Sequence, residues 1–328
     1  MTRQETYEYI KQNIRPATLK DEFGLERFSH SKLETFHNCP YRYYLHYEKN
    51  QCEQSDSIAL ELGHLFHEIM EERGRVMLGE LDVSIDTQDA KARWENKIKN
   101  IKRRRWDEWI PDKEGITYDE KIERFWNYYP MSILDENWKP FACEQEFHFV
   151  WKNKLRGYGF IDRLDVNQEG NIRVTDYKTS RAVYNKKSRD YAQQMAVYAM
   201  ACVCLYDKLP TNFEYDFIFL NVRSPAMERQ DSIIQSIDNI DELVGEVFSA
   251  AESRKFFPAP KPLCHWCDFC ATNDRADREF KSLCDYYSKW TREKKDFGVH
   301  QIFNKETFNA DEAFEIALGT AQKKTLVW

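Results

Sequence analysis

The chain has 328 residues, and its 48 lysine and arginine residues against 55 aspartate and glutamate residues give a formal net charge of −7. With only 11 glycines and 10 prolines, the composition excludes fibrous and disordered classes. The longest apolar run, residues 195–206, is shorter than the roughly 20 residues that cross a bilayer, and the N-terminus has no apolar signal segment. We therefore expect a cytoplasmic protein with no membrane partner.

The first predicted elements are helices. A polar helix is expected within residues 1–27, and either Ser29 or Ser31 is suited to cap the aromatic helix that follows. Apolar residues at helical spacing predict a further helix over residues 57–78, and a charged helix is expected over residues 88–110. This half of the chain is therefore predicted to be helical.

The apolar pattern changes to strand-like alternation from about residue 142. The segments LRGYGFIDRLDV and NIRVTDYKTS are expected to form two strands joined by the turn NQEGN. The later predicted elements are a helix over 189–206, a strand over 216–222 and a helix over 238–254. Strands flanked by helices predict an α/β fold with a central mixed sheet.

The charged helix carries a basic segment that has two interpretations. Between Lys91 and Arg105 there are eight basic residues and one acidic residue, Glu95. A solvated helix face would explain this charge, but tryptophans beside the arginines favour a nucleic-acid groove, because bases stack on aromatic rings while cations neutralise phosphates. The residues expected to bind nucleic acid are Lys102, Arg103, Arg104, Arg105 and Trp106.

Two carboxylates and a lysine form the sharpest chemical pattern. Residues i and i+2 of a strand share a face, so Asp176 and Lys178 are expected to point the same way. If the two strands pair antiparallel through the NQEGN turn, Asp162 lies beside Asp176 at the end of the sheet. Such a set suits a hard divalent cation, with the lysine orienting or activating water.

The order of these motifs along the chain resembles a known family. The motifs are Ser29-x-Ser31, Cys39-Pro40, Gly63-x3-His67, Gly159-x-Ile161-Asp162, Asp176-x-Lys178, Gln194-x3-Tyr198 and a terminal cysteine cluster. Residues 28–270 resemble the RecB-type PD-(D/E)xK nucleases, and in particular the iron–sulfur branch that includes the nuclease domain of AddB and the CRISPR-adaptation exonucleases. The resemblance implies a restriction-endonuclease-like core with a helical insertion and a C-terminal cysteine cluster.

The resemblance also implies roles for individual residues. The implied ligands of Mg²⁺ or Mn²⁺ are His67, Asp162, Asp176 and the Tyr177 carbonyl. The implied catalytic residues are Asp162, Asp176, Lys178, Gln194 and Tyr198, with Lys178 as the catalytic lysine and the last two supporting the site and touching DNA. For Glu146, on the preceding strand, a salt bridge is favoured over a role at the metal.

The nine cysteines fit the iron–sulfur branch with one departure. In this branch one N-terminal and three C-terminal cysteines hold a [4Fe–4S] cluster, which implies Cys39, Cys264 and Cys267 as ligands. The usual last spacing, C-x5-C, would place the fourth at position 273, which is an asparagine. Cys270 is favoured instead and Cys284 is the alternative, while a Zn²⁺ ion bound by four thiolates competes with the cluster.

The expected organisation is a single nuclease domain over residues 1–328. Its predicted parts are N-terminal helices (28–80), a basic helical insertion (81–140), a catalytic core (141–255), a cysteine-cluster region (256–284) and a helical tail (285–328).

The expected function is that of a metal-dependent DNA exonuclease acting on single strands or DNA ends, in recombination, repair or phage DNA metabolism. The alternatives are an endonuclease or flap nuclease with the same site, and a non-catalytic DNA-binding subunit of a larger complex. The sequence has no G-x4-G-K-[ST] motif, so DNA unwinding would need a partner. A helicase, a recombinase or a single-strand-binding protein would suit, and a nuclease of this kind would suit a phage.

Overall fold

A computed structural model describes most of the chain in two compact units. The described residues are 2–25, 27–51, 58–104, 116–132, 135–180, 182–185, 187, 192–227, 230–270, 283–288 and 303–325. Residues 1–30 and 56–239 form one unit, here called the sheet unit, and residues 31–55 and 240–328 form the other, the cysteine unit. That the two units together form a single nuclease domain stays a prediction. None of the described helices is long and apolar enough to span a membrane.

The sheet unit is built on a seven-stranded mixed sheet, as the α/β prediction expected. Its strands are β1 (Ile14–Pro16), β2 (Arg27–Phe28), β3 (Trp138–Trp151), β4 (Leu155–Asn167), β5 (Ile172–Lys178), β6 (Asn212–Phe217) and β7 (Val222–Pro225). They follow the order β1-β3-β4-β5-β6-β7, with β2 beside β4. The NQEGN turn joins antiparallel β4 and β5 as predicted, with Gly170 at φ 77°, a left-handed conformation that glycine adopts without strain.

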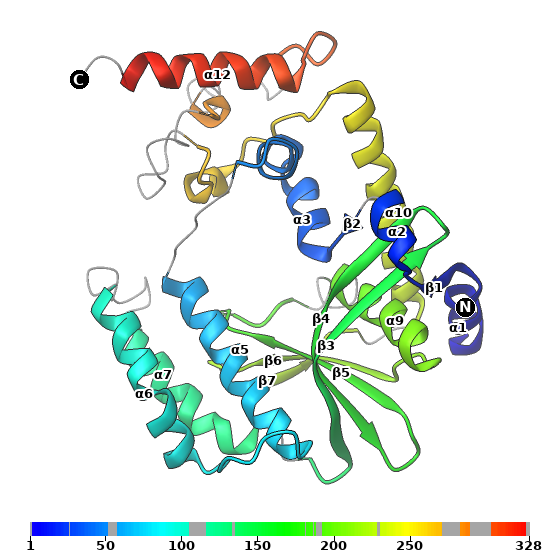
Figure 1. Ribbon diagram of the computed structural model, residues 1–328, viewed down its shortest axis with the longest axis vertical. Helices are drawn as coiled ribbons and strands as arrows, with labels where there is room; N and C mark the ends of the chain where they lie inside the picture. The colour runs from blue at the N-terminus through cyan, green and yellow to red at the C-terminus, as the bar shows by residue number, and fades with distance from the viewer. Residues whose placement is uncertain are drawn as a thin grey trace. The chain divides into compact units, whose positions relative to one another are not determined.

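Helices cover both faces of this sheet (Figure 1). One side carries three helices, α5 (Ile58–Met77), α6 (Thr87–Arg104) and α7 (Tyr118–Tyr128). The turn η3 (Tyr129–Met131) follows α7 directly. On the other side α9 (Gln193–Tyr206) packs against α1 (Arg3–Asn13), β1 and β3. The short helix α2 (Leu19–Gly24) completes the N-terminal part of the unit.

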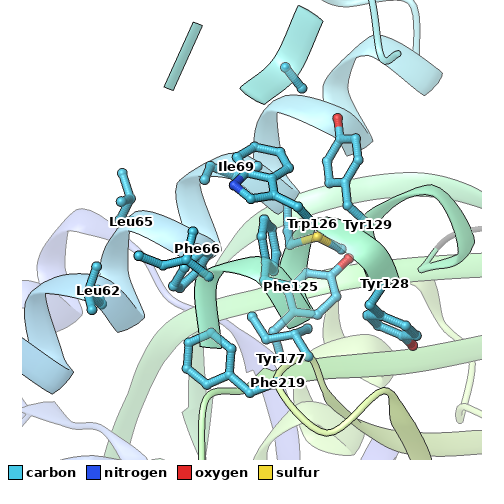
Figure 2. Close-up of a cluster of buried hydrophobic side chains, with 14 of the residues drawn as sticks. Leu62, Leu65, Phe66, Ile69, Phe125, Trp126, Tyr128, Tyr129, Tyr177 and Phe219 are labelled. Atoms are coloured by element: carbon cyan, nitrogen blue, oxygen red, sulfur yellow. The ribbon is translucent and has the colours of Figure 1, made fainter. Parts of the chain in front are cut away.

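An aromatic core joins α5 and α7 to the sheet (Figure 2). Phe66 of α5 packs against Phe125 and Phe219, with ring centroids 4.3 and 4.9 Å apart. Tyr177 of β5 belongs to the same cluster, so burial of these rings fixes α5 against the strand that carries Asp176 and Lys178.

The predicted strand over 216–222 is wrong in its position. The strand β6 ends at Phe217, and residues 218–221 form a turn in which Asn221 has a φ of 55°. Ile218 and Phe219 extend the apolar run of β6 and so predict a longer strand. Their side chains are instead buried from a turn, in the core that they share with α5 and α7.

The cysteine unit brings residues from both ends of the chain together. It contains most of α3 (His30–Asn38), then α4 (Pro40–Tyr43), the π-helical turn η1 (Tyr44–Glu48), the last part of α10 (Gln230–Ser253), the turn η4 (Pro262–Trp266) and α12 (Ala310–Thr325). The Tyr44 hydroxyl donates to Asp311 at 2.7 Å, and Arg254 forms an ion pair with the same carboxylate at 2.6 Å. Phe256 stacks on Tyr43, so the N-terminal segment is held by residues more than 200 positions later.

Candidate active site and cysteine site

The β4–β5 hairpin brings Asp162 and Asp176 together. The register pairs Arg163 with Thr175, and one step further along both strands places the two aspartates opposite each other. Asp162 is 9% exposed and Asp176 is 2% exposed. Asp162 Oδ2 accepts a hydrogen bond from the Tyr177 backbone N–H at 2.6 Å, which fixes this carboxylate at the point where the strands part.

Lys178 and two side chains of α9 surround Asp176. Lys178 Nζ lies 2.6 Å from Asp176 Oδ2 and donates to Gln194 Oε1 at 2.9 Å. Asp176 Oδ1 accepts from Gln194 Nε2 at 2.8 Å and from the Tyr198 hydroxyl at 3.1 Å. The i, i+4 spacing of Gln194 and Tyr198 therefore places both on the helix face that orients the Asp176–Lys178 pair.

His67 reaches the site from α5. Its Nδ1 lies 3.5 Å from Asp162 Oδ2. Gly63, one turn earlier, lets α5 approach the sheet: a Cβ at this position would lie 3.3 Å from Thr179 Oγ1. The sequence motif Gly63-x3-His67 thus combines a close helix–strand contact with a side chain at the carboxylates.

Tyr177 points away from the two residues that flank it. Its hydroxyl accepts a hydrogen bond from Arg163 Nη1 at 2.9 Å, on the face of the sheet covered by α5 and α7. Arg163 is fully buried and also contacts Asp165. The Tyr177 side chain therefore anchors the strand, and the metal-binding role of its carbonyl stays a prediction.

Glu144 of β3 belongs to the site, although none of the sequence motifs contains it. His67, Glu144 and Asp162 each offer one ligand atom, and these atoms all lie within 4.8 Å of one another. Counting back from the tight turn that joins Trp151 to Leu155 would pair residue 144 with residue 162, and that is the signal the sequence contained. Glu146 instead accepts a hydrogen bond from His148 at 2.9 Å, consistent with the structural role expected for it.

The crowded carboxylates are electrostatically strained without a cation. Burial, and then the neighbouring charges of Asp162 and Glu71, raise the pKa of Glu144 to about 8. Burial and the charge of Asp176 likewise raise the pKa of Asp162. Burial alone would lower the pKa of Lys178, but the Asp176 carboxylate outweighs it and the net pKa is raised. A divalent cation would relieve this repulsion, so the donor set fits a metal ion.

The basic segment of α6 is partly neutralised by neighbouring helices. Lys102 forms an ion pair with Asp119 of α7 at 2.6 Å, and Arg104 forms one with Glu61 of α5. Arg103 is exposed, and no carboxylate pairs with it within the described part of the chain. The other two predicted nucleic-acid contacts, Arg105 and Trp106, lie outside the described residues.

The cysteine unit gathers all the predicted cluster ligands. A cavity of about 140 Å³ is lined by Cys39, Cys264, Cys267, Cys270 and Cys284. Backbone N–H groups of Ala259 and Lys261 donate to the sulfurs of Cys39 and Cys264, each at 3.4 Å. The backbones of Cys270 and Cys284 form an isolated parallel β-bridge, with no disulfide between them. Both alternatives for the fourth ligand therefore lie at the same cavity.

Comparison with known proteins places these features in a family. The sequence profile of the PD-(D/E)XK nuclease superfamily matches residues 27–272. The chain is similar to one subunit of the ATP-dependent helicase/deoxyribonuclease, with 23% identity over 240 residues to that of Streptococcus pyogenes serotype M6 and 25% identity over 244 residues to that of Streptococcus agalactiae serotype Ia. Each match covers 70% of this chain but 21% of the relative, so the chain spans about a fifth of those proteins. Because the profile covers most of its length, the chain belongs to the PD-(D/E)XK nuclease superfamily.

Proposed function

We propose that this chain is a metal-dependent DNA exonuclease that hydrolyses phosphodiester bonds on single strands or at DNA ends. The observation that carries the proposal is the convergence of Asp162, Asp176 and Lys178 at the end of the β4–β5 hairpin, with Gln194 and Tyr198 bonded to them. Similarity to proteins named as helicase/deoxyribonuclease subunits supports DNA as the substrate.

The residues of the site divide into those that hold a cation and those that act on water and phosphate. The aspartates, His67 and the Tyr177 carbonyl would hold Mg²⁺ or Mn²⁺. Such a cation polarises the phosphate and lowers the pKa of a water molecule. Lys178, held by Asp176 and Gln194, would orient the attacking water and stabilise the charge that develops on the phosphate.

A [4Fe–4S] cluster is the proposed occupant of the cysteine cavity, held by Cys39, Cys264, Cys267 and Cys270. The cavity of about 140 Å³ is lined by five cysteines, which supplies the four thiolates that a [4Fe–4S] cluster needs.

The proposed partners follow from the relatives. Those proteins are named as subunits of an ATP-dependent helicase/deoxyribonuclease, and we propose that this chain likewise acts with a helicase, a recombinase or a single-strand-binding protein in recombination, repair or phage DNA metabolism.

Arg103 is proposed as a DNA contact, together with Lys102, Arg104, Arg105 and Trp106. Arg103→Ala should weaken DNA binding and reduce the slope of log affinity against log salt by about 0.7–0.9. Lys102→Ala should have a smaller effect, because Asp119 already neutralises Lys102. Fluorescence anisotropy over a salt series measures both variants. Equal, negligible effects would show that the basic segment is a solvated face.

Exonuclease and endonuclease activity can be separated by substrate shape. Linear single-stranded DNA should be degraded from its end in Mn²⁺, whereas a closed circle of the same sequence should remain intact, since it offers no end. Gel analysis of both substrates over time gives the result. Cutting of the circle would identify an endonuclease, and no cleavage of either by folded protein would favour a DNA-binding subunit.

A further inference from the structure

We propose that Glu144 is a ligand of the divalent cation, which it would hold together with His67 and Asp162. This inference rests on the proposed nuclease function. The three ligand atoms come from α5, β3 and β4 and lie within 4.8 Å of one another. Two carboxylates provide the hard oxygen ligands that Mg²⁺ and Mn²⁺ prefer, and an imidazole is a common ligand for first-row transition metals.

The backbone of β3 directs Glu144 to this position. The pairs Cys143–Arg163 and Gln145–Ile161 flank it, so the register places Glu144 opposite Asp162. Glu144 has a φ of 45° within the strand, a left-handed conformation that is unfavourable for a non-glycine residue. Such a conformation persists only where the surrounding structure holds it.

The hydrogen bonds of Asp176 limit how many lone pairs it can offer to a cation. Both of its oxygens already have partners: Oδ1 accepts from Gln194 and Tyr198, and Oδ2 pairs with Lys178. Glu144 supplies the second carboxylate beside His67 and Asp162 without breaking those contacts. Asp176 can therefore hold Lys178 and share the cation through a remaining lone pair of Oδ2, while Glu144 adds a further carboxylate to the metal-binding set.

A hollow beside Glu144 gives a cation a route from solvent. It has a volume of about 700 Å³ and is lined by His67, Glu144 and Thr179, with Glu68 and Glu71 of α5 on its wall. Glu68 pairs with Lys97 and Glu71 pairs with Arg75, so these two carboxylates contribute little net charge to the hollow.

Mn²⁺ binding to the metal-free protein, without DNA, tests the inference. Glu144→Gln keeps the shape of the side chain and removes its charge. It should weaken Mn²⁺ binding by at least tenfold, because the loss of a group that merely supports a metal ligand already lowers the affinity by about 10- to 100-fold. Glu146→Gln is the matched control two residues away on the same strand, and it should bind Mn²⁺ like the wild type, because Glu146 is exposed and contacts His148. Titration calorimetry and the EPR signal of free Mn²⁺ measure the affinity.

The outcomes separate this inference from the proposed function. Wild-type Mn²⁺ affinity in folded Glu144→Gln would overturn the inference, even if the wild-type chain cleaves DNA. Loss of Mn²⁺ binding in that variant would support it, even if the wild-type chain proved unable to cleave DNA. Glu144→Asp separates a folding defect from the loss of a ligand. It retains a carboxylate on a shorter side chain and should bind Mn²⁺ with intermediate affinity. If Glu144→Asp is unfolded and its Mn²⁺ affinity is as low as that of Glu144→Gln, the loss reflects folding and counts against a ligand role.

Discussion

Replacing Lys178 with alanine is expected to lower the single-turnover rate of DNA cleavage by about 10²- to 10⁴-fold, the range typical of a positioned acid–base group. Lys178 lies between Asp176 and Gln194 at hydrogen-bonding distance from both. The substitution removes this amine, and no other lysine among the described residues pairs with Asp176. DNA affinity should remain close to that of the wild type, because most affinity comes from contacts with the phosphate backbone elsewhere. Cleavage of a labelled oligonucleotide in Mn²⁺, and anisotropy in Ca²⁺, measure the two quantities.

The same substitution should also reduce the stability of the metal-free protein. Asp176 is 2% exposed, and removing the partner of a buried charge typically costs about 3–5 kcal/mol. Thermal unfolding with and without Mn²⁺ would detect this loss and its recovery by the cation. Lys208→Ala is a suitable control, since Lys208 is exposed and contacts the Gly170 carbonyl. Wild-type cleavage by Lys178→Ala would contradict the role of Lys178.

Replacing Cys264 with serine should remove the iron from the protein and destabilise the cysteine unit. Anaerobically purified wild-type protein is expected to be brown and to contain about four irons per chain. Five cysteines line one cavity, and burial together with neighbouring thiols raises the pKa of Cys284. The binding energy of the proposed cluster would therefore be part of the folding energy of this unit. Iron analysis, absorption spectra and limited proteolysis measure the effect.

Further cysteine variants make this test specific. Cys204→Ser should keep its iron, because Cys204 lies on α9 in the sheet unit. Cys270→Ser should lose the cluster and Cys284→Ser should retain it, and the reverse result would identify Cys284 as the fourth ligand. Colourless wild-type protein with one bound zinc would contradict the cluster.

The β4–β5 hairpin that holds Asp162, Asp176 and Lys178 was predictable because these residues lie within a short stretch of sequence. The i, i+2 spacing of Asp176 and Lys178 and the NQEGN turn together determine which side chains meet at the sheet end. The pairing of Gln194 with Tyr198 is equally local, since i and i+4 share a helix face. Local geometry was sufficient for these residues.

Other features depend on contacts between distant segments, and the sequence alone did not reveal them. The position of Glu144 depends on both the β3–β4 register and an unusual φ. The partners of the basic segment, Glu61 and Asp119, come from helices on either side of α6. The apolar residues after β6 predict a strand that does not form, because burial in a turn and burial in a strand give the same short apolar run.

Hydrolysis of end-labelled single-stranded DNA by the anaerobically purified wild-type chain is the most direct test of a metal-dependent nuclease. We expect degradation in Mn²⁺ or Mg²⁺, none in EDTA, and restored degradation when the cation is added back. Intact DNA in every lane, from a folded protein that carries its cluster, would contradict it.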